Sequence, residues 1–221
     1  MKWLLVIAII ILLLPLLGCA RALLIDQRSG VHFVVYANDV PIEKLDYIEN
    51  AIKMVRHMTK PEIVFHILEP DSVHLGKTWM GGSAAAHLCY IGVGRVCMSA
   101  NYICYRTIFH EVGHLYHSRR NRESRRFHLD WVALAGPVYI QDTKLPNTDG
   151  ILTNYSRGNP GEDIAEWVAE CYAYLAEGVN SCITGNLAVK TDPRYRQKLA
   201  LLHLHGFFTD ADYEKLKPLF Q

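Results

Sequence analysis

The chain has 221 residues and a formal net charge of +1 at pH 7, and apolar side chains occupy half of its positions. This length and apolar content are typical of one globular domain of medium size with a buried core. The near-neutral charge gives no indication of nucleic-acid binding, so we expect no nucleic-acid partner.

Residues 1–18 are predicted to be a signal peptide. Lys2 is followed by an apolar run from Trp3 to Leu17, which is short for a membrane span and typical of the apolar core of a signal peptide. The run ends in LLGC, which resembles the lipobox of bacterial lipoproteins and would make Cys19 the lipidated first residue of the mature chain. The alternatives are an ordinary signal peptide or an uncleaved anchor. We expect an extracytoplasmic protein that is bound to a membrane through an N-terminal lipid or is secreted.

We expect residues 19–30 to form the lipidated N-terminus and a short linker, and residues 31–221 to form a single domain. No repeat, low-complexity tract or further linker is found in that domain. Its residue patterns predict, in chain order, a strand at 31–37, a helix at 41–58, a strand at 62–68, a hairpin centred on Val93, helices at 102–118 and 160–177, and two short helices near the C-terminus. This order predicts an α+β fold, with a small mixed sheet followed by a helical C-terminal half.

Five cysteines lie in the predicted mature domain, and export permits them to form disulfides. A hairpin turn at the glycines of IGVG would set Cys89 opposite Cys97 on neighbouring strands. Cys171 and Cys182 flank the end of a predicted helix and form a second candidate pair. Cys104 is then expected to be a buried apolar side chain, the commonest role of an unpaired cysteine.

The stretch TIFHEVGHLYHSRR contains an HExxH motif within a predicted helix. His110 and His114 are four residues apart and therefore lie on one helical face, opposite an apolar face. Two imidazoles at this spacing can bind one zinc ion, and Glu111, a third of a turn away, can reach a water on that ion. The motif predicts a zinc hydrolase with Glu111 as general base. The alternative is a pair of core or surface histidines with Glu111 in solvent.

A third histidine, His117, follows on the same helical face. It lies about 10 Å along the helix axis from His110, which is too far to bind the same ion on an unbroken helix. Arg120 stands where the metzincin pattern has its third histidine. We therefore expect His117 beside the site or on the surface, and a third ligand from another part of the chain.

The stretch NPGEDIAEWVAE is the best candidate for that third ligand. Glu162, Glu166 and Glu170 recur at intervals of four residues, so one helix face carries three carboxylates that repel one another unless a positive partner faces them. A helix that bears zinc would be such a partner. Asp163 is a further candidate. Glu162 has an alternative role, because it stands at the capping-box position of a helix with Asn159 as its N-cap.

HEVGH, followed by Tyr155 and then by EDIAE, resembles the catalytic domain of anthrax lethal factor and the related Pro-Pro endopeptidases. The serine after the tyrosine departs from the glycine of the family pattern. The resemblance implies a zincin-like fold of the glutamate-ligand (gluzincin) type, with one zinc ion per chain. The implied site residues are the zinc ligands His110, His114 and Glu162, the base Glu111, the oxyanion donor Tyr155, and Glu166, which would hydrogen-bond a ligand histidine.

These residues predict a zinc metallopeptidase that hydrolyses bonds in peptide or protein substrates. We expect the substrate to extend along an edge strand beside the zinc helix, with the Cys89–Cys97 hairpin as the candidate strand. Tyr155 has an alternative role as a core aromatic. The alternative function is a non-catalytic surface lipoprotein that uses a zincin scaffold for binding. Glu111 favours the enzyme, because a purely structural metal site needs no base there.

Overall fold

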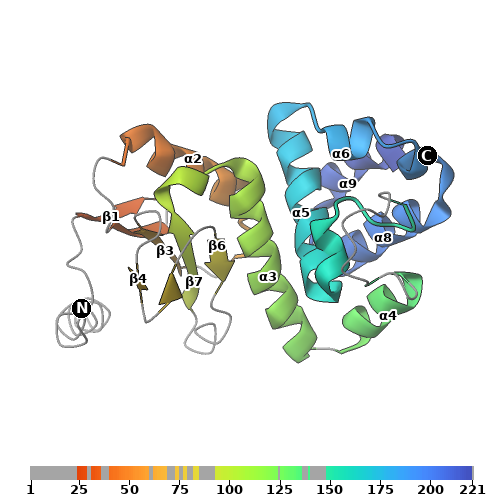
Figure 1. Ribbon diagram of the computed structural model, residues 1–221, viewed down its shortest axis with the longest axis horizontal. Coiled ribbons are helices and arrows are strands. Elements are labelled where there is room, and N and C mark those ends of the chain that lie inside the picture. Colours follow the sequence, from red (N-terminus) through yellow and green to blue (C-terminus); the bar gives the residue numbers. More distant parts are fainter. Residues whose placement is uncertain are drawn as a thin grey trace.

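The computed structural model (Figure 1) describes residues 24–28, 31–35, 40–59, 62–68, 73–74, 77–78, 82–84, 93–123, 125–135, 139 and 148–220. The predicted signal peptide at residues 1–18, the lipidation candidate Cys19 and the disulfide candidate Cys89 lie outside these ranges. Within the described part of the chain, no helix combines the length and the apolar character that a membrane span requires.

A five-stranded sheet is built from the first half of the chain. The strands are β1 (Leu24–Arg28), β2 (Val31–Val35), β3 (Glu62–Leu68), β4 (Val73–His74), β5 (Lys77–Thr78), β6 (Gly82–Ala84) and β7 (Val93–Ser99). The sheet order is β1-β2-β3-β7-β6, and β4 pairs with β5 in a separate ribbon. The central strands β2, β3 and β7 are parallel, whereas β1 and β6 run antiparallel at the two edges.

Alternate residues of β2 and β3 are apolar and buried, which is the period expected of strands that cover a core. The registered pair Phe33 and Phe65 lies at the centre of this layer. Helix α2 (Ile42–Met54) packs against the sheet (Figure 1) and buries Leu45, Ile48 and Ile52 at helical spacing. The strands predicted around positions 31 and 62 and the helix predicted around position 45 are therefore confirmed.

The prediction of a linker was wrong for residues 24–28, which form the edge strand β1. Leu24 pairs with Val35 and Arg28 with Val31, so this segment belongs to the same sheet as the domain. The last three residues of β1 are polar, and no alternation of apolar and polar residues marks the strand in the sequence. Backbone hydrogen bonds to β2 create the strand, and such pairing cannot be recognised from side-chain pattern alone.

The remainder of the described chain is mainly helical. The α-helices are α3 (Tyr105–Glu123), α4 (Arg126–Ala135), α5 (Pro160–Glu177), α6 (Ser181–Thr184), α7 (Leu187–Thr191), α8 (Pro193–Leu204) and α9 (Asp210–Leu216), and the 3-10 helices are η3 (Ala100–Tyr102), η4 (Tyr155–Gly158) and η5 (Lys217–Phe220). The predicted class, a small mixed sheet followed by a helical half, agrees with this order. More helices follow α5 than the two short ones that we expected, and α4 was not expected at all.

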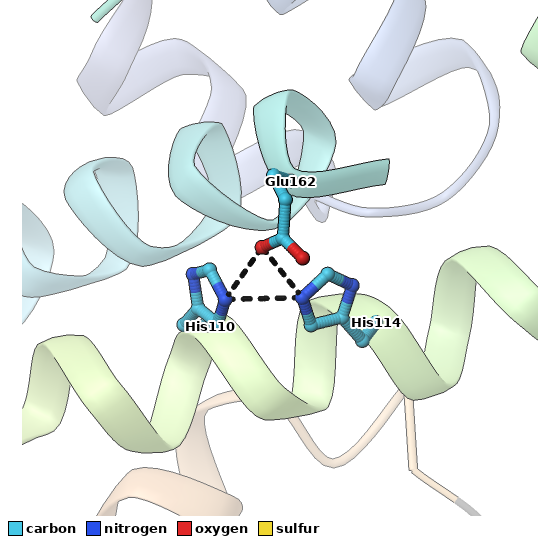
Figure 2. Close-up of side chains that lie close together, drawn as sticks. All are labelled: His110, His114 and Glu162. Atoms are coloured by element: carbon cyan, nitrogen blue, oxygen red, sulfur yellow. Dashed lines mark hydrogen bonds and ion pairs between the residues drawn. The ribbon is translucent and has the colours of Figure 1, made fainter. Parts of the chain in front are cut away.

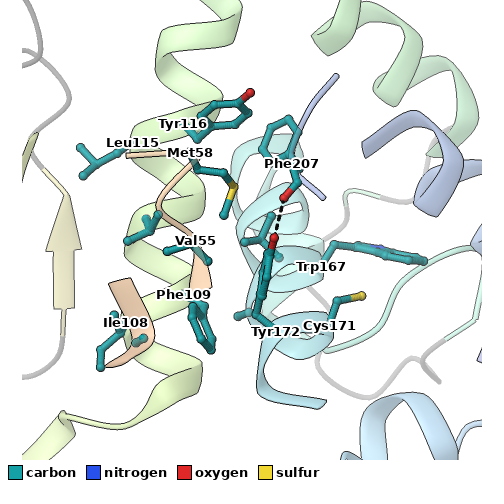
Figure 3. Close-up of a cluster of buried hydrophobic side chains, with 14 of the residues drawn as sticks. Val55, Met58, Ile108, Phe109, Leu115, Tyr116, Trp167, Cys171, Tyr172 and Phe207 are labelled. Carbon is teal, nitrogen blue, oxygen red and sulfur yellow. Dashed lines mark hydrogen bonds between the residues drawn. The ribbon is translucent and has the colours of Figure 1, made fainter. Parts of the chain in front are cut away.

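Helix α3 lies between the sheet and α5, and both of its sides are packed (Figure 1). On the α5 side, the ring of Phe109 lies 5.2 Å from that of Tyr172. The Tyr172 hydroxyl donates a hydrogen bond of 3.0 Å to the carbonyl of Phe207, which ties α5 to the C-terminal helices (Figure 3). Ile108 and Val112 of α3 are also fully buried. The helix that carries HEVGH is therefore held in place by the core.

The predicted disulfides do not agree with the structure. The antiparallel neighbour of Cys97 in the sheet is Ser83 of β6, so the hairpin register that we expected between Cys97 and Cys89 is wrong. Cys171 and Cys182 are both free thiols. The side chain of Cys171 is instead buried in the core of α5. Cys104 is exposed beside Thr107, not buried as predicted.

Candidate metal centre

Two antiparallel helices, α3 and α5, bring the predicted site residues together. Gly113, the glycine of HEVGH, lies at their closest approach. A Cβ at this position would meet the Cα of Ala165 and the Cβ of Val168, both at 3.2 Å. That separation is tighter than ordinary van der Waals contact, so a side chain at position 113 would require the facing residues of α5 to shift. The glycine therefore lets the histidines of α3 reach the carboxylates of α5.

Three side chains place one donor atom each at the corners of a small triangle (Figure 2). The Nε2 atoms of His110 and His114 are 3.0 Å apart, and Oε2 of Glu162 lies 3.2 Å from the first and 3.1 Å from the second. A four-coordinate zinc site with metal–donor distances of about 2.0 Å has donor–donor distances of about 3.3 Å. The triangle therefore fits one face of a tetrahedral site, with the fourth position left for a water molecule or a substrate.

The electrostatics of this triangle favour a bound cation. Burial alone would lower the pKa of His110, but hydrogen bonds to Glu162 and Glu166 outweigh it and raise that pKa to about 9. Burial raises the pKa of Glu162, but the hydrogen bonds from the two histidines bring it down to about 2. The carboxylates thus stabilise a positive charge at His110, and a bound cation would take the place of that proton, because zinc binds neutral imidazole nitrogens together with an ionised carboxylate.

Glu111 follows His110 and is almost completely buried, with 4% of its surface exposed. Its Oε2 atom has no hydrogen-bond partner among the described residues. Burial is the main reason why the pKa of Glu111 is raised, and the neighbouring histidines only partly oppose it. A buried carboxylate oxygen without a partner is unfavourable, and a water molecule held by an ion between the histidines would supply one.

Glu166 fixes the orientation of the His110 ring through a hydrogen bond to its Nδ1 atom. Its Oε1 accepts a hydrogen bond of 2.8 Å from Nδ1 of His110, which leaves Nε2 turned toward the donor triangle. Its Oε2 accepts hydrogen bonds of 2.5 Å from Thr153 and from Arg106. Burial would raise the pKa of Glu166, but the contacts with His110 and Arg106 lower it. Glu166 therefore occupies the position that the family resemblance implies.

Among the described residues, the Glu162 carboxylate makes no capping-box hydrogen bond with the backbone nitrogen of Asn159. The Asn159 side chain accepts hydrogen bonds from the backbone nitrogens of Gly161 and Glu162, at 2.8 and 3.0 Å. Asn159 is therefore the N-cap of α5, as predicted, with Pro160 in the first turn. The carboxylate of Glu162 points instead toward His110 and His114 (Figure 2).

The two other candidate ligands on α5 are engaged elsewhere. Oδ2 of Asp163 is completely buried and accepts hydrogen bonds from Lys198, Trp131 and Tyr139. Glu170 binds the Arg106 guanidinium through one oxygen and the Asn180 amide through the other. Neither carboxylate belongs to the donor triangle.

Tyr155 lies beside the site and not in the core. It begins η4, and 61% of its surface is exposed. Its ring centroid lies 5.7 Å from that of His110. Burial raises the pKa of its hydroxyl, with a further contribution from the charges of Glu162 and Glu111. The exposure argues against the alternative of a core aromatic and leaves the side chain accessible to a substrate.

His117 lies outside the donor triangle, as its spacing predicted. Its side chain is buried, and its Nε2 atom lies 3.4 Å from Nδ1 of His128 on α4. The two imidazole rings are nearly parallel, and Phe127 packs edge-on against His117. Burial, followed by the proximity of His128, lowers the pKa of His117 to about 4. His117 therefore connects the end of α3 to α4.

Arg106 and Thr153 are site residues that sequence reasoning missed. Arg106 stands one helical turn before His110, and this spacing was the available signal that it faces the carboxylates of α5. Nothing in the sequence identifies Thr153, because its contact with Glu166 depends on the path of the chain before η4.

Comparison of the chain with protein-family models, with curated proteins and with solved structures found no match.

Proposed function

We propose that the protein is a zinc-dependent endopeptidase with a zincin-like fold. The observation that carries the proposal is the convergence of His110, His114 and Glu162 on one point, with the buried Oε2 of Glu111, which has no hydrogen-bond partner among the described residues, beside them. Two histidines and one carboxylate are a ligand set of zinc hydrolases, and they leave a coordination position open. The resemblance of HEVGH, Tyr155 and EDIAE to the gluzincin pattern supports the same assignment.

In the proposed reaction, the chain positions a water molecule, moves its proton and stabilises the developing charge. When bound, zinc lowers the pKa of that water and polarises the substrate carbonyl. Glu111 accepts the proton of the attacking water at its buried Oε2 and delivers it to the nitrogen of the leaving amine. The Tyr155 hydroxyl donates a hydrogen bond to the carbonyl oxygen as negative charge develops there. Glu166 keeps Nε2 of His110 oriented through its hydrogen bond to Nδ1.

The substrate would be a peptide or a protein segment in extended conformation. Among the described strands, β6 is at an edge of the sheet and contacts α3, so its side away from β7 is the candidate for pairing with an added strand. Within the described residues, β6 replaces the Cys89–Cys97 hairpin as the candidate strand.

We further propose that the enzyme acts outside the cytoplasm and is held at a membrane by a lipid on Cys19. The support is the apolar run that ends in LLGC. Mass analysis of the mature N-terminus is expected to find an acylated Cys19. A mature chain that begins at Ala20, or that retains Met1, would contradict the lipid anchor without affecting the proposed reaction.

Metal analysis combined with cleavage of a peptide library tests the proposed function. We expect one zinc ion per chain and cleavage that a chelator abolishes and added zinc restores. Stoichiometric zinc without cleavage of any library member would instead favour the non-catalytic binding scaffold. A protein that binds no zinc would contradict both functions.

A further inference from the structure

We propose that Arg106 is a positioning residue of the metal centre, which acts by locking the carboxylate of Glu166 against His110. This inference rests on the proposed function, because it concerns how the ligand histidine is oriented. Arg106 would touch neither the metal nor the substrate. Its guanidinium reaches across from α3 to α5 and contacts two carboxylates there.

The Arg106 guanidinium contacts both carboxylates through separate nitrogens. Arg106 donates from Nε to Oε1 of Glu170 and from Nη2 to Oε2 of Glu166, the latter at 2.5 Å. These two carboxylates stand one helical turn apart on α5. A guanidinium is planar and presents its donors in a fixed fork, so a contact through two of its nitrogens defines the orientation of both acceptors. A lysine at this position could supply the charge but not the fork.

The two oxygens of Glu166 contact different partners. Oε1 serves His110, whereas Oε2 is held by Arg106 on one side and by Thr153 on the other. Because a carboxylate is rigid, fixing Oε2 from two directions also fixes where Oε1 lies. Without Arg106, a single hydroxyl would hold Oε2. The terminal torsion of a glutamate is broad, so Glu166 could then turn away from the imidazole.

Arg106 also supplies a positive charge between two buried carboxylates. The side chains of Glu166 and Glu170 are each 97% buried, and like charges four residues apart on a helix repel one another. Arg106 is the cation that faces both. Arg106 lies on the same face of α3 as His110 and His114. Each of the three carboxylates on the facing side of α5, Glu162, Glu166 and Glu170, therefore contacts a partner on α3. The Arg106 side chain itself is 49% exposed, which means that its replacement leaves the apolar core intact.

Zinc affinity of the full-length, metal-free protein, measured by competition with a chromophoric chelator, tests the inference. Arg106→Met is expected to weaken zinc binding about tenfold, at the lower end of what loss of an outer partner of a ligand histidine causes. Arg106→Lys is expected to stay within about twofold of Arg106→Met, because it lacks the fork. Lys53→Met, which removes an exposed partner of Glu49 on α2, is the matched control and should bind zinc as the unmodified protein does.

A double-mutant cycle distinguishes two roles of Arg106, namely positioning His110 through Glu166 and holding α3 and α5 together. In a Glu166→Gln background, Arg106→Met is expected to change zinc affinity by less than about twofold, because the carboxylate through which it acts is gone. In a Glu170→Gln background, most of the effect of Arg106→Met should remain. Thermal unfolding of each metal-free variant verifies that it is folded.

Three results would overturn the inference. The first is unchanged zinc affinity in Arg106→Met, and the second is an equal loss with and without the Glu166 carboxylate. The third is full recovery by Arg106→Lys, which would reduce the role of Arg106 to its charge. Each of these leaves the proposed function standing, provided that the unmodified protein binds one zinc. Failure of the unmodified protein to bind zinc would instead remove the proposed function and this inference together.

Discussion

Oε2 of Glu162 lies 3.1 Å from Nε2 of His114, although the two residues are 48 positions apart and belong to different helices. The contact exists because α3 and α5 pack closely at Gly113 and because the Glu162 carboxylate is not engaged in a capping box with the N-cap Asn159. It completes the donor triangle with His110. The assignment of a third zinc ligand therefore depends on the carboxylate of Glu162.

Replacing the Glu162 carboxylate should weaken metal binding more than any other substitution on α5. Glu162→Ala is expected to weaken zinc binding by well over about 100-fold, because loss of a direct ligand exceeds the effect of losing an outer partner. Glu170→Ala is the comparison, since its oxygens contact Arg106 and Asn180 and not the triangle. Chelator competition measures both. Full zinc affinity in Glu162→Ala would exclude this residue as a ligand.

The buried ion pair between Lys198 and Asp163 should be important for stability. Nζ of Lys198 lies 2.5 Å from Oδ2 of Asp163 and 2.9 Å from the carbonyl oxygen of Gly150, and its side chain is completely buried. Lys198→Met leaves a buried carboxylate without its cation and is expected to lower the free energy of unfolding by about 3 to 5 kcal/mol. Adding Asp163→Asn should recover part of this loss. Urea unfolding measures both, and a loss below about 1 kcal/mol in Lys198→Met would contradict the assignment.

His117 should make the metal-free protein less stable in acid. Its pKa is about 4 in the folded state and about 6.5 in an unfolded chain. Between these values the unfolded state binds a proton that the folded state does not, so the free energy of unfolding falls as the pH decreases from about 6.5 to 4, by roughly 3 kcal/mol. His117→Gln lacks this titration and should lose correspondingly less stability in that window. Parallel pH dependences for the two metal-free proteins would contradict the burial of a neutral His117.

Tyr155 should affect turnover and not metal binding. Tyr155→Phe removes the hydroxyl beside the site and is expected to lose about 2 to 4 kcal/mol of transition-state stabilisation, the effect of one oxyanion donor. The loss should appear mainly in kcat, because the charge that the hydroxyl stabilises is absent from the bound substrate. Tyr102→Phe, at another exposed tyrosine, is the control. An unchanged kcat in Tyr155→Phe would leave the proposed oxyanion contact without support.

The helices and strands that could be predicted are those whose ends or faces are marked by features of the local sequence. The bounds of α5 follow from the cap at Asn159 and from Gly178, which adopts a φ of 73° just after the helix. By contrast, α3 begins at Tyr105 and not near position 102, because residues 100–102 form a 3-10 turn instead. Strand β1 carries no alternation, so only its pairing with β2 reveals it.

The site residues likewise fall into those that local spacing predicts and those that only tertiary contacts reveal. The spacing of His110, Glu111 and His114 places them on one helix and was sufficient to predict their proximity. Which carboxylate of α5 completes the triangle depends on the register between two helices, and spacing within one helix leaves Glu162 and Glu170 equivalent. The spacing of Arg106 before His110 indicates only which face of α3 it lies on, whereas the contacts of Arg106 and Thr153 with Glu166 join separate segments and are seen in the folded chain.

The central claim is that Glu111 is the general base of a zinc peptidase, and one variant tests it most directly. Glu111→Gln preserves the shape of the side chain and all three proposed ligands, but an amide cannot accept a proton from water. We expect Glu111→Gln to bind one zinc per chain, as the unmodified protein does. Cleavage of the best library peptide is expected to fall at least about 100-fold, the minimum for loss of a general base. Glu43→Gln, at an exposed position in the first turn of α2, should retain full activity. A zinc-loaded Glu111→Gln protein that cleaves the peptide at the unmodified rate would contradict the mechanism.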